Sequence, residues 1–379
     1  MLNIIKNDII AKAVAYTVSE SIDAKLMHLL KRPYDAEFTG SNGDTVRIEV
    51  DGEVDAYVFD QDVGIIVQDY SNSSIELEIK TQIDTSIGIT QKEATFDMPN
   101  FTEKMADKAG KAIAKFIERY AVENAIMSLS NFMITGDLDS SEKLIDINTF
   151  FDERNVSTVN RFVVLSTSQK AIVMKKCKDI VETYKRGTNE TITGAEIGFV
   201  WGSNYVWSNQ LDQINKEVVK STYSNTGTLA VALKGGEKEV HLKGGVADET
   251  INKFSVVKVG NVSFVVKEDV EVAADGSAVL KTDRVVGTAA VNATISYVGV
   301  VNSLVLDPNS MVLACVAPSN AVGENMAYIS DATNGFGVSV QWGWDIKFKK
   351  GIVSFSTYVG FLNVNKNLNA GTVTAAADM

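Results

Sequence analysis

Residues 99–132 read PNFTEKMADKAGKAIAKFIERYAVENAIMSLSNF, and this stretch decides the fold. Asn100 is a good N-cap, and Glu103 follows three residues later in a near capping-box arrangement. A helix of this length would measure roughly 45 Å, against an average of about 11–12 residues for globular helices. The sequence therefore predicts one long helix against which other elements pack. Its apolar side chains recur at helical spacing on one face: Phe101, Met105, Ala109, Ile113, Phe116 and Tyr120.

The same helix carries a second, basic stripe beside the apolar one. Two interpretations are open. One is a solvated face supported by an Asp107–Lys111 pair at i,i+4. The other is a docking track for an acidic partner or a polyanion. The stripe follows the helical period through Lys104, Lys108, Lys111, Lys115 and Arg119.

Composition narrows the class of protein. The chain has 379 residues, which allows about two or three domains, and its 45% hydrophobic and 22% charged residues are typical of a folded protein. The net charge of −12 argues against sequence-independent nucleic-acid binding, because that affinity comes from cationic neutralisation of phosphates. A protein that only encloses nucleic acid tolerates such a charge.

Cysteine usage and hydropathy indicate the compartment. Cys177 and Cys315 are the only cysteines, so a disulfide framework is excluded and two reduced, buried thiols are expected. Lys6 and Asp8 come too early for a signal peptide. The apolar run over 285–323 is interrupted by polar residues and dominated by β-branched ones, so we expect buried strands and no membrane span. The sequence predicts a soluble, intracellular protein.

The first hundred residues change periodicity once. Residues 1–33 are predicted to be a helical arm, and 34–97 are predicted to contain a long hairpin whose strands, 44–50 and 74–80, alternate with a period of two. An isolated two-stranded ribbon is marginal in water, so its apolar residues need cover from their own domain or from a neighbouring subunit. The hairpin tip carries Asp51, Glu53, Asp55, Asp60 and Asp62, and the residues that need cover are Val46, Ile48, Ile75, Leu77 and Ile79.

The chain after the long helix (98–134) divides into three predicted parts. Residues 135–214 alternate helix and strand, with helices at 147–155 and 168–184, a strand at 161–165, and two strands around a turn at 202–204. Residues 215–300 are predicted to be an inserted small β-barrel or sandwich, since tight-turn signals separate short strands. Residues 301–379 return as strand, turn and helix over 303–317 and a strand pair over 339–364. The strands of the insert are predicted at 228–233, 239–242, 254–259, 262–266, 278–282 and 293–298.

Catalytic motifs are absent from the sequence. His28 and His241 are the only histidines, and neither has the second histidine or cysteine pair of a metal site. No phosphate loop, dinucleotide fingerprint or G-x-S-x-G elbow occurs. We therefore expect no enzyme activity, no cofactor and no metal.

Two other groups of residues partly resemble functional sites. Asp137 and Asp139 begin like a calcium loop, but Glu142 and Asn148 occupy the positions that need Gly and Glu, which excludes an EF-hand. Trp201 and Trp207 flank Gly202 and would suit ligand stacking, although packing against a neighbouring helix is the default for strand aromatics.

Four stretches, taken in order, carry a resemblance to a known family: QIDTSIGITQKEATFDMPNFTEKMADKAG (82–110), FFDERNVSTVNRFVVLSTSQKAIV (150–173), IGFVWGSNYVWSNQL (197–211) and FVVKEDVEVAADGSAVLKTDR (264–284). With the order of elements around them, they resemble the HK97-like major capsid proteins of tailed bacteriophages. More narrowly, the chain is similar to the phage P22 coat-protein group, which carries an inserted β-domain.

The resemblance implies an α+β, HK97-like fold with a peripheral domain, a spine helix, an axial α/β domain and the inserted domain. Residues 34–92 would be the extended loop that reaches a neighbouring subunit. Segments 142–213 and 301–340 would form the axial domain. The charged loop of the insert is a candidate contact between subunits, with an inert turn as the alternative: Lys234, Glu237, Lys238 and Glu239.

The resemblance also implies the function and the partners. The chain would assemble with itself into hexamers and pentamers of an icosahedral shell, with a scaffolding protein and a portal protein, in the host cytoplasm. The virion would enclose double-stranded DNA without sequence-specific binding and without a membrane. Two alternatives are an encapsulin-like nanocompartment shell and an enzyme that uses the Trp201 and Trp207 surface.

Overall fold

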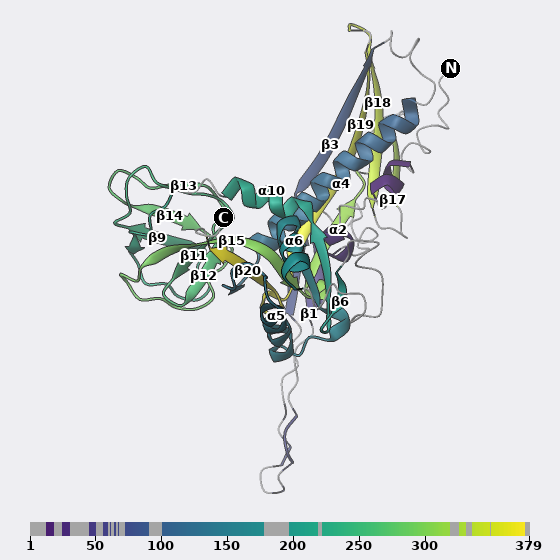
Figure 1. Ribbon diagram of the computed structural model, residues 1–379. Coiled ribbons are helices and arrows are strands. Elements are labelled where there is room, and N and C mark those ends of the chain that lie inside the picture. The colour runs from purple at the N-terminus through teal and green to yellow at the C-terminus, as the bar shows by residue number, and fades with distance from the viewer. Residues whose placement is uncertain are drawn as a thin grey trace.

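The computed structural model is a mixed α+β fold with several sheets (Figure 1). It describes residues 13–18, 25–30, 45–50, 56–59, 61, 64, 65, 67, 73–90, 101–177, 197–218, 222–318, 326–330, 336–348 and 350–375. Of the predicted N-terminal arm, residues 13–18 are helical and α2 spans Lys25–Leu30; the other arm residues lie outside this set.

The predicted long helix is confirmed as α4 (Phe101–Met127), although it is shorter than 98–134. It ends where the chain turns into β4 (Asn131–Met133), which pairs in parallel with β20 (Ala370–Ala375). Its buried face is centred on Ala114, Ile117 and Ala121. Phe116 lies on the opposite side of the helix and is 47% exposed, so its placement on the apolar stripe was wrong.

The largest sheet in the described part of the chain has eight strands. Its strand order is β12-β11-β15-β5-β7-β6. In addition, β20 pairs with β15, and β4 pairs with β20. The predicted strand at 161–165 is confirmed as β5 (Phe162–Ser166), and the turn near 202 joins β6 (Gly198–Val200) to β7 (Ser203–Ser208). The connecting helices are α5 (Ser141–Glu153), α6 (Thr167–Lys176) and α10 (Asn209–Val218), with 3-10 turns η1 (Thr158–Asn160) and η3 (Lys366–Leu368). The predicted helix 168–184 is seen as α6 up to Lys176. Its predicted residues 178–184 belong to the range 178–196, which is outside the described set.

A five-stranded sheet lies under α4, as Figure 1 shows at the upper right. The strands are β3 (Thr81–Thr90), β16 (Met311–Val316), β17 (Met326–Ser330), β18 (Gly337–Asp345) and β19 (Lys350–Asn363). The helix predicted after 308 is wrong, because β16 pairs with β19 throughout and is buried on both faces. A short apolar run fits a buried strand and a buried helix equally well, so its pattern could not decide. The predicted strand pair over 339–364 is confirmed as β18 and β19.

The region that was predicted to be an insert (residues 215–300, here called the insert) forms two facing sheets in its described part. One contains β8 (Thr228–Leu229), β9 (Glu239–Lys243) and β14 (Ala278–Lys281), and the other contains β11 (Ser255–Val259), β12 (Val262–Val265) and the first part of β15 (Ile295–Leu306). A small ladder joins β10 (Thr250–Ile251) to β13 (Val270–Glu271). The described strands close no barrel, so the sandwich alternative describes this region better.

Strand β15 joins the insert to the rest of the fold. It pairs with β11 in the insert and with β5 and β20 beyond it, so one continuous strand serves both regions. The insert nevertheless has its own apolar core between the facing sheets, which includes Leu242, Val257 and Phe264. The neighbouring Val256 points to the other face and joins the large core that contains α4.

Candidate assembly surfaces

The predicted hairpin is confirmed at its base. Strands β1 (Thr45–Val50) and β2 (Ser73–Glu78) pair antiparallel, and within the described part of the chain no third strand is hydrogen-bonded to them, so they form a two-stranded ribbon. The predicted continuation of β2 toward Ile89 instead belongs to β3, which pairs with β19.

The ribbon base is sheltered within its own chain. Leu77 packs with Val312 and Ala314 of β16 and is fully buried, and Val46 is also buried. These two side chains therefore offer no surface to a neighbour, which corrects their place among the predicted contact residues. Ile48, Ile75 and Ile79 are half-buried, and their contact with a neighbour stays a prediction. A Cβ at Gly360 of β19 would lie 2.9 Å from the Glu78 carbonyl oxygen, so a glycine is needed where the ribbon base crosses that strand.

The ribbon tip, here residues 56–59, 61, 64, 65 and 67, is exposed and apolar. Val58 is 95% exposed, Val67 86% and Ile65 82%, and Tyr57 and Phe59 are exposed by more than half. Figure 1 shows the described pieces of this connection, in blue, well away from the body. A cluster of exposed apolar side chains of this kind marks an interaction surface. The acidic residues of this connection were predicted to form its tip, but its apolar character was not predicted; the signal for it in the sequence is the two apolar runs, YVF (57–59) and IIV (65–67).

The basic stripe of α4 is preserved in part. Lys108, Lys111 and Lys115 are exposed, and the predicted pair is confirmed by a Lys111 Nζ–Asp107 Oδ2 distance of 2.8 Å. Arg119 is engaged elsewhere, since it contacts Glu123 at 2.7 Å and Glu217 of α10 at 3.0 Å. The side chain of Lys104 lies outside the described set. The exposed ring of Phe116 lies next in sequence to Lys115 and gives this face a mixed basic and apolar character.

The predicted contact loop of the insert lies at a surface pocket. Glu237, Lys238 and Glu239 line it together with Val231, Leu233 and His241, and its volume is about 340 Å³. Lys234 is exposed beside it. The role of this loop as a contact between subunits stays a prediction.

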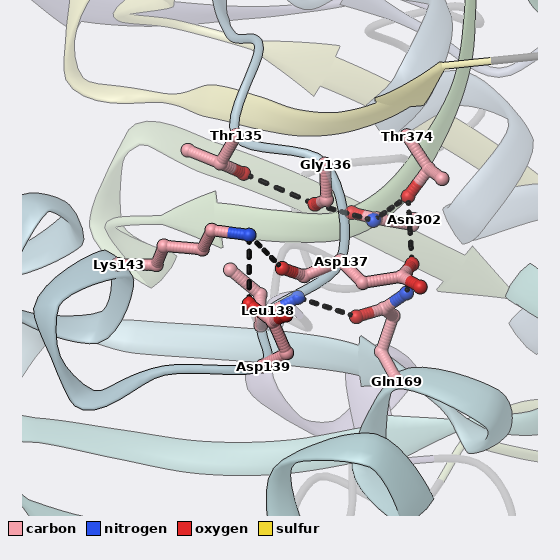
Figure 2. A network of polar contacts seen from close by, with 9 residues as sticks. All are labelled: Thr135, Gly136, Asp137, Leu138, Asp139, Lys143, Gln169, Asn302 and Thr374. Atoms are coloured by element: carbon pink, nitrogen blue, oxygen red, sulfur yellow. Dashed lines mark hydrogen bonds and ion pairs between the residues drawn. The ribbon is translucent and has the colours of Figure 1, made fainter. Parts of the chain in front are cut away.

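A polar network fixes the loop that leaves α4 and β4 (Figure 2). The Gln169 amide of α6 donates to Asp137 Oδ1 at 2.5 Å and accepts from the Leu138 backbone N–H at 3.0 Å. Thr374 of β20 also donates to Asp137, at 3.3 Å. The two acidic residues that resembled a calcium loop therefore lie in a structural network that joins the loop to α6 and β20.

The same network continues to α5 and β15. Lys143 donates to the Asp137 carbonyl at 2.7 Å and to the Asp139 carboxylate at 2.8 Å, and this hydrogen bond lowers the pKa of Asp139. Asn302 of β15 donates to the Gly136 carbonyl at 3.3 Å and contacts Thr374. Because four elements converge on one loop, the junction between α4 and the eight-stranded sheet is held in one arrangement.

A second polar contact connects the insert to the C-terminal segment. Asp283 lies between Lys267, at 2.9 Å, and Lys366 of η3, with which it forms an ion pair. Burial raises the pKa of Asp283, but the hydrogen bonds from Lys366 and Lys267 outweigh it and hold the pKa below its usual value. Because the pKa of Asp283 is lowered in the folded state, this contribution to stability is fully present at neutral pH. It is lost as the pH falls from the ordinary pKa of an aspartate through the lowered pKa of Asp283.

We expect Asp283→Asn to lower the free energy of unfolding by about 1–2 kcal/mol, because two lysines lose their shared anion at a partly buried site. Urea unfolding at pH 7 measures the change. Glu268→Gln is the matched control, since the Glu268–Lys281 pair is exposed on both sides. Equal losses in the two variants would contradict a special role for Asp283.

The remaining candidate residues are not gathered into one site. Trp201 lies at the β6–β7 turn with a φ of 46° and is 42% exposed, whereas Trp207 packs under Lys170 at 4.5 Å. Only Trp207 of the two lines the pocket of about 150 Å³ beside β7. His241 is exposed on the insert, and the His28 ring lies edge-on to Phe336. Cys177 and Cys315 are buried.

The described ranges contain neither a candidate metal site nor a candidate membrane-spanning helix. No group of three or more His, Cys, Asp or Glu residues there is placed to hold a metal ion. No helix in the same ranges has the length and apolar character needed to cross a membrane.

Comparison with known proteins places the fold. No protein-family model and no curated protein matches the sequence. Among solved structures, one titled "Mycobacterium phage Che8" matches 92% of this chain and 90% of its own, with a TM-score of 0.51 at 10% identity. The chain shares the fold of a phage protein. Lower TM-scores of 0.47 and 0.46 are found for "Capsid of native GTA particle computed with C5 symmetry" (6% identity, covering 88% of this chain and 86% of that one) and "Asymmetric unit of bacteriophage PhiM1 mature capsid" (11% identity, covering 88% and 82%).

Proposed function

We propose that this chain is the major capsid protein of a tailed phage, an HK97-like subunit that assembles into an icosahedral shell around double-stranded DNA. The observation that carries the proposal is the ribbon. Its base is packed on β16, whereas its tip presents Val58, Ile65 and Val67 almost fully to solvent. An apolar segment on an arm away from the body is suited to a surface that another copy provides.

The rest of the fold suits the same role. A shell repeats each contact many times, so individual contacts can be modest while closed symmetry makes the assembly durable. The α4 helix on the five-stranded sheet and the hydrogen-bonded loop at Asp137 provide rigid units. The ribbon provides an extended arm. A net charge of −12 keeps enclosed DNA from adhering to the wall. The shell role requires no enzyme activity and no cofactor.

The insert supports assignment to the P22-like group. It has a separate apolar core, and it shares strand β15 with the eight-stranded sheet. Both features fit a domain that is inserted into the axial unit while the eight-stranded sheet stays continuous. We place the insert at contacts that stabilise subunits within a capsomer, with its charged loop at 234–239 as the contact. A scaffolding protein and a portal protein are the further partners, and assembly takes place in the host cytoplasm.

Charge complementarity suggests where the ribbon binds. The connection 51–72 contains six acidic residues and no basic one: Asp51, Glu53, Asp55, Asp60, Asp62 and Asp69. The α4 face with Lys108, Lys111, Lys115 and Phe116 is basic and partly apolar. Opposite charges of this kind steer association and fix its register.

We expect Lys108→Glu with Lys115→Glu to slow assembly at least tenfold and to reverse the salt dependence of the residual rate, because attraction becomes repulsion and added salt then screens the repulsion. Light scattering against time at two salt concentrations measures both effects. Lys243→Glu with Lys258→Glu reverses two charges on the insert and is the control. Assembly of the α4 variant at the wild-type rate would show that the stripe is a solvated face.

The contents of purified particles test the function itself. We expect shells that contain nuclease-protected double-stranded DNA when the chain is produced during phage growth. Particles filled with a protein cargo and free of DNA would instead identify an encapsulin-like nanocompartment. Failure to form any particle in that setting would contradict both.

A further inference from the structure

Glu118 is a buried carboxyl group at the meeting point of three elements. It projects from α4, is 1% exposed, and accepts hydrogen bonds from the backbone N–H groups of Leu26, at 3.3 Å, and Met27, at 2.7 Å. These amides open α2, where a helix has no internal acceptor for them. The Ser208 hydroxyl at the end of β7 donates to the same carboxyl at 2.7 Å. Glu118 therefore joins the N-terminal helix, the long helix and the eight-stranded sheet.

The position of α2 against the rest of the fold, here called its seat, depends on the contact with Glu118. The helix has six residues, too few to be stable alone, and it buries Leu26, Met27 and Leu30 completely. It contacts α4, β7, β16 and η2. Its last residue precedes β1 by fifteen positions (45 − 30), so α2 anchors the chain shortly before the ribbon begins.

No cation balances Glu118 in the described part of the chain. On α4, Lys115 is exposed, and Arg119 is paired with Glu123 and Glu217. Strand β7 carries no charged residue, and α10 contributes Asp212, Lys216 and Glu217. On α2, His28 is exposed at the Phe336 ring and the side chain of Lys25 lies outside the described set, while β16 contributes Cys315 and η2 is preceded by Asp307.

We propose that Glu118 is a proton-operated latch: the neutral carboxyl holds α2 in its seat, and ionisation increases how often α2 opens. The neutral group can donate from Oε1 to Ser208 Oγ while Oε2 accepts from the Met27 N–H, so the two shorter contacts are kept and only the longer one, from the Leu26 N–H to Oε1, is weakened. The ionised group has the same neighbours but is cut off from water, and opening of α2 restores its hydration. This inference goes beyond a shell role, because it gives the segment leading to the ribbon a response to pH.

The direction of the response follows from linkage. Burial raises the pKa of Glu118 to about 7, against the three hydrogen bonds, which lower it. An acid whose pKa is raised in the closed state stabilises that state fully below its ordinary pKa, and the stabilisation is lost as the pH rises to about 7. The opening of α2 therefore increases between pH 5 and 7.5 and then levels off.

Hydrogen exchange over α2 in the full-length chain, corrected for the intrinsic pH dependence of exchange, tests the latch. We expect the opening equilibrium of the wild type to rise roughly 10- to 50-fold from pH 5 to pH 7.5. Glu118→Gln mimics the neutral carboxyl, so we expect a rise of less than about twofold. Glu123→Gln, on the same helix, should retain the wild-type response.

Ser208→Ala provides a second, independent variant. Loss of its hydroxyl removes a hydrogen bond that lowers the pKa of Glu118, so the pH at which opening levels off should move upward. A merely structural role for Glu118 would leave that pH unchanged. A wild-type rise in Glu118→Gln, or no rise in the wild type, would overturn the proposal.

Discussion

We expect that replacing Val58 and Val67 with serine abolishes particle formation while the subunit keeps its melting temperature within about 2 °C. Both side chains are almost fully exposed in the single chain, so their loss removes little folding energy. In a shell the same side chains would be buried at every ribbon contact, and each valine would lose about 1.5–3 kcal/mol of burial. Because the contact repeats through the shell, the loss multiplies. Electron microscopy and sedimentation measure assembly, and thermal unfolding measures the fold.

The matched control is Val246→Ser on the insert, which is 49% exposed and lies outside the ribbon. We expect this variant to assemble like the wild type. Normal shells from the Val58 and Val67 double variant would show that the tip is not an assembly contact.

The second large effect is expected in the insert. Phe264→Ala should lower its stability by about 3–5 kcal/mol, because the ring is 1% exposed between the two facing sheets and leaves a cavity. The insert core is separate from the core around α4, so we expect an added early transition in calorimetry. Limited proteolysis should then cut within 222–294 before it cuts α4.

Phe264→Leu keeps most of the volume and should cost less than about 1.5 kcal/mol. A single, wholly shifted transition in Phe264→Ala would contradict the view that the insert has a stability of its own. It would indicate that the shared strand β15 makes the two regions unfold together.

Periodicity predicted the elements whose two faces differ. The helix α4 has one buried and one exposed face, and the ribbon strands β1 and β2 and the insert strands β9 and β14 alternate more and less buried residues, so their type could be predicted from the pattern. Strand β16 is buried on both faces and has no such alternation, which is why a helix was predicted there. Phe116 was placed on the wrong side because Ile113 lies at the edge of the buried face, and a three-residue step from that edge leads to the exposed side.

The candidate surfaces were harder to predict than the fold. The apolar character of Val58 and Val67 was visible in the sequence, but their exposure follows from the ribbon geometry. The burial of Leu77 depends on β16, more than two hundred residues away, and no local pattern encodes it. The role of Glu118 had no sequence signal at all, since its partners Leu26 and Met27 lie about ninety residues earlier in the chain.

Self-association of the purified full-length chain tests the central claim most directly. Sedimentation and electron microscopy over rising concentration, alone and with a co-expressed scaffolding protein, give the result in one series. We predict closed shells, or ring-shaped capsomers that convert to shells when the scaffold is present. A compact monomer that persists at high concentration, with the ribbon folded against its own body and no particle under either condition, would contradict the account.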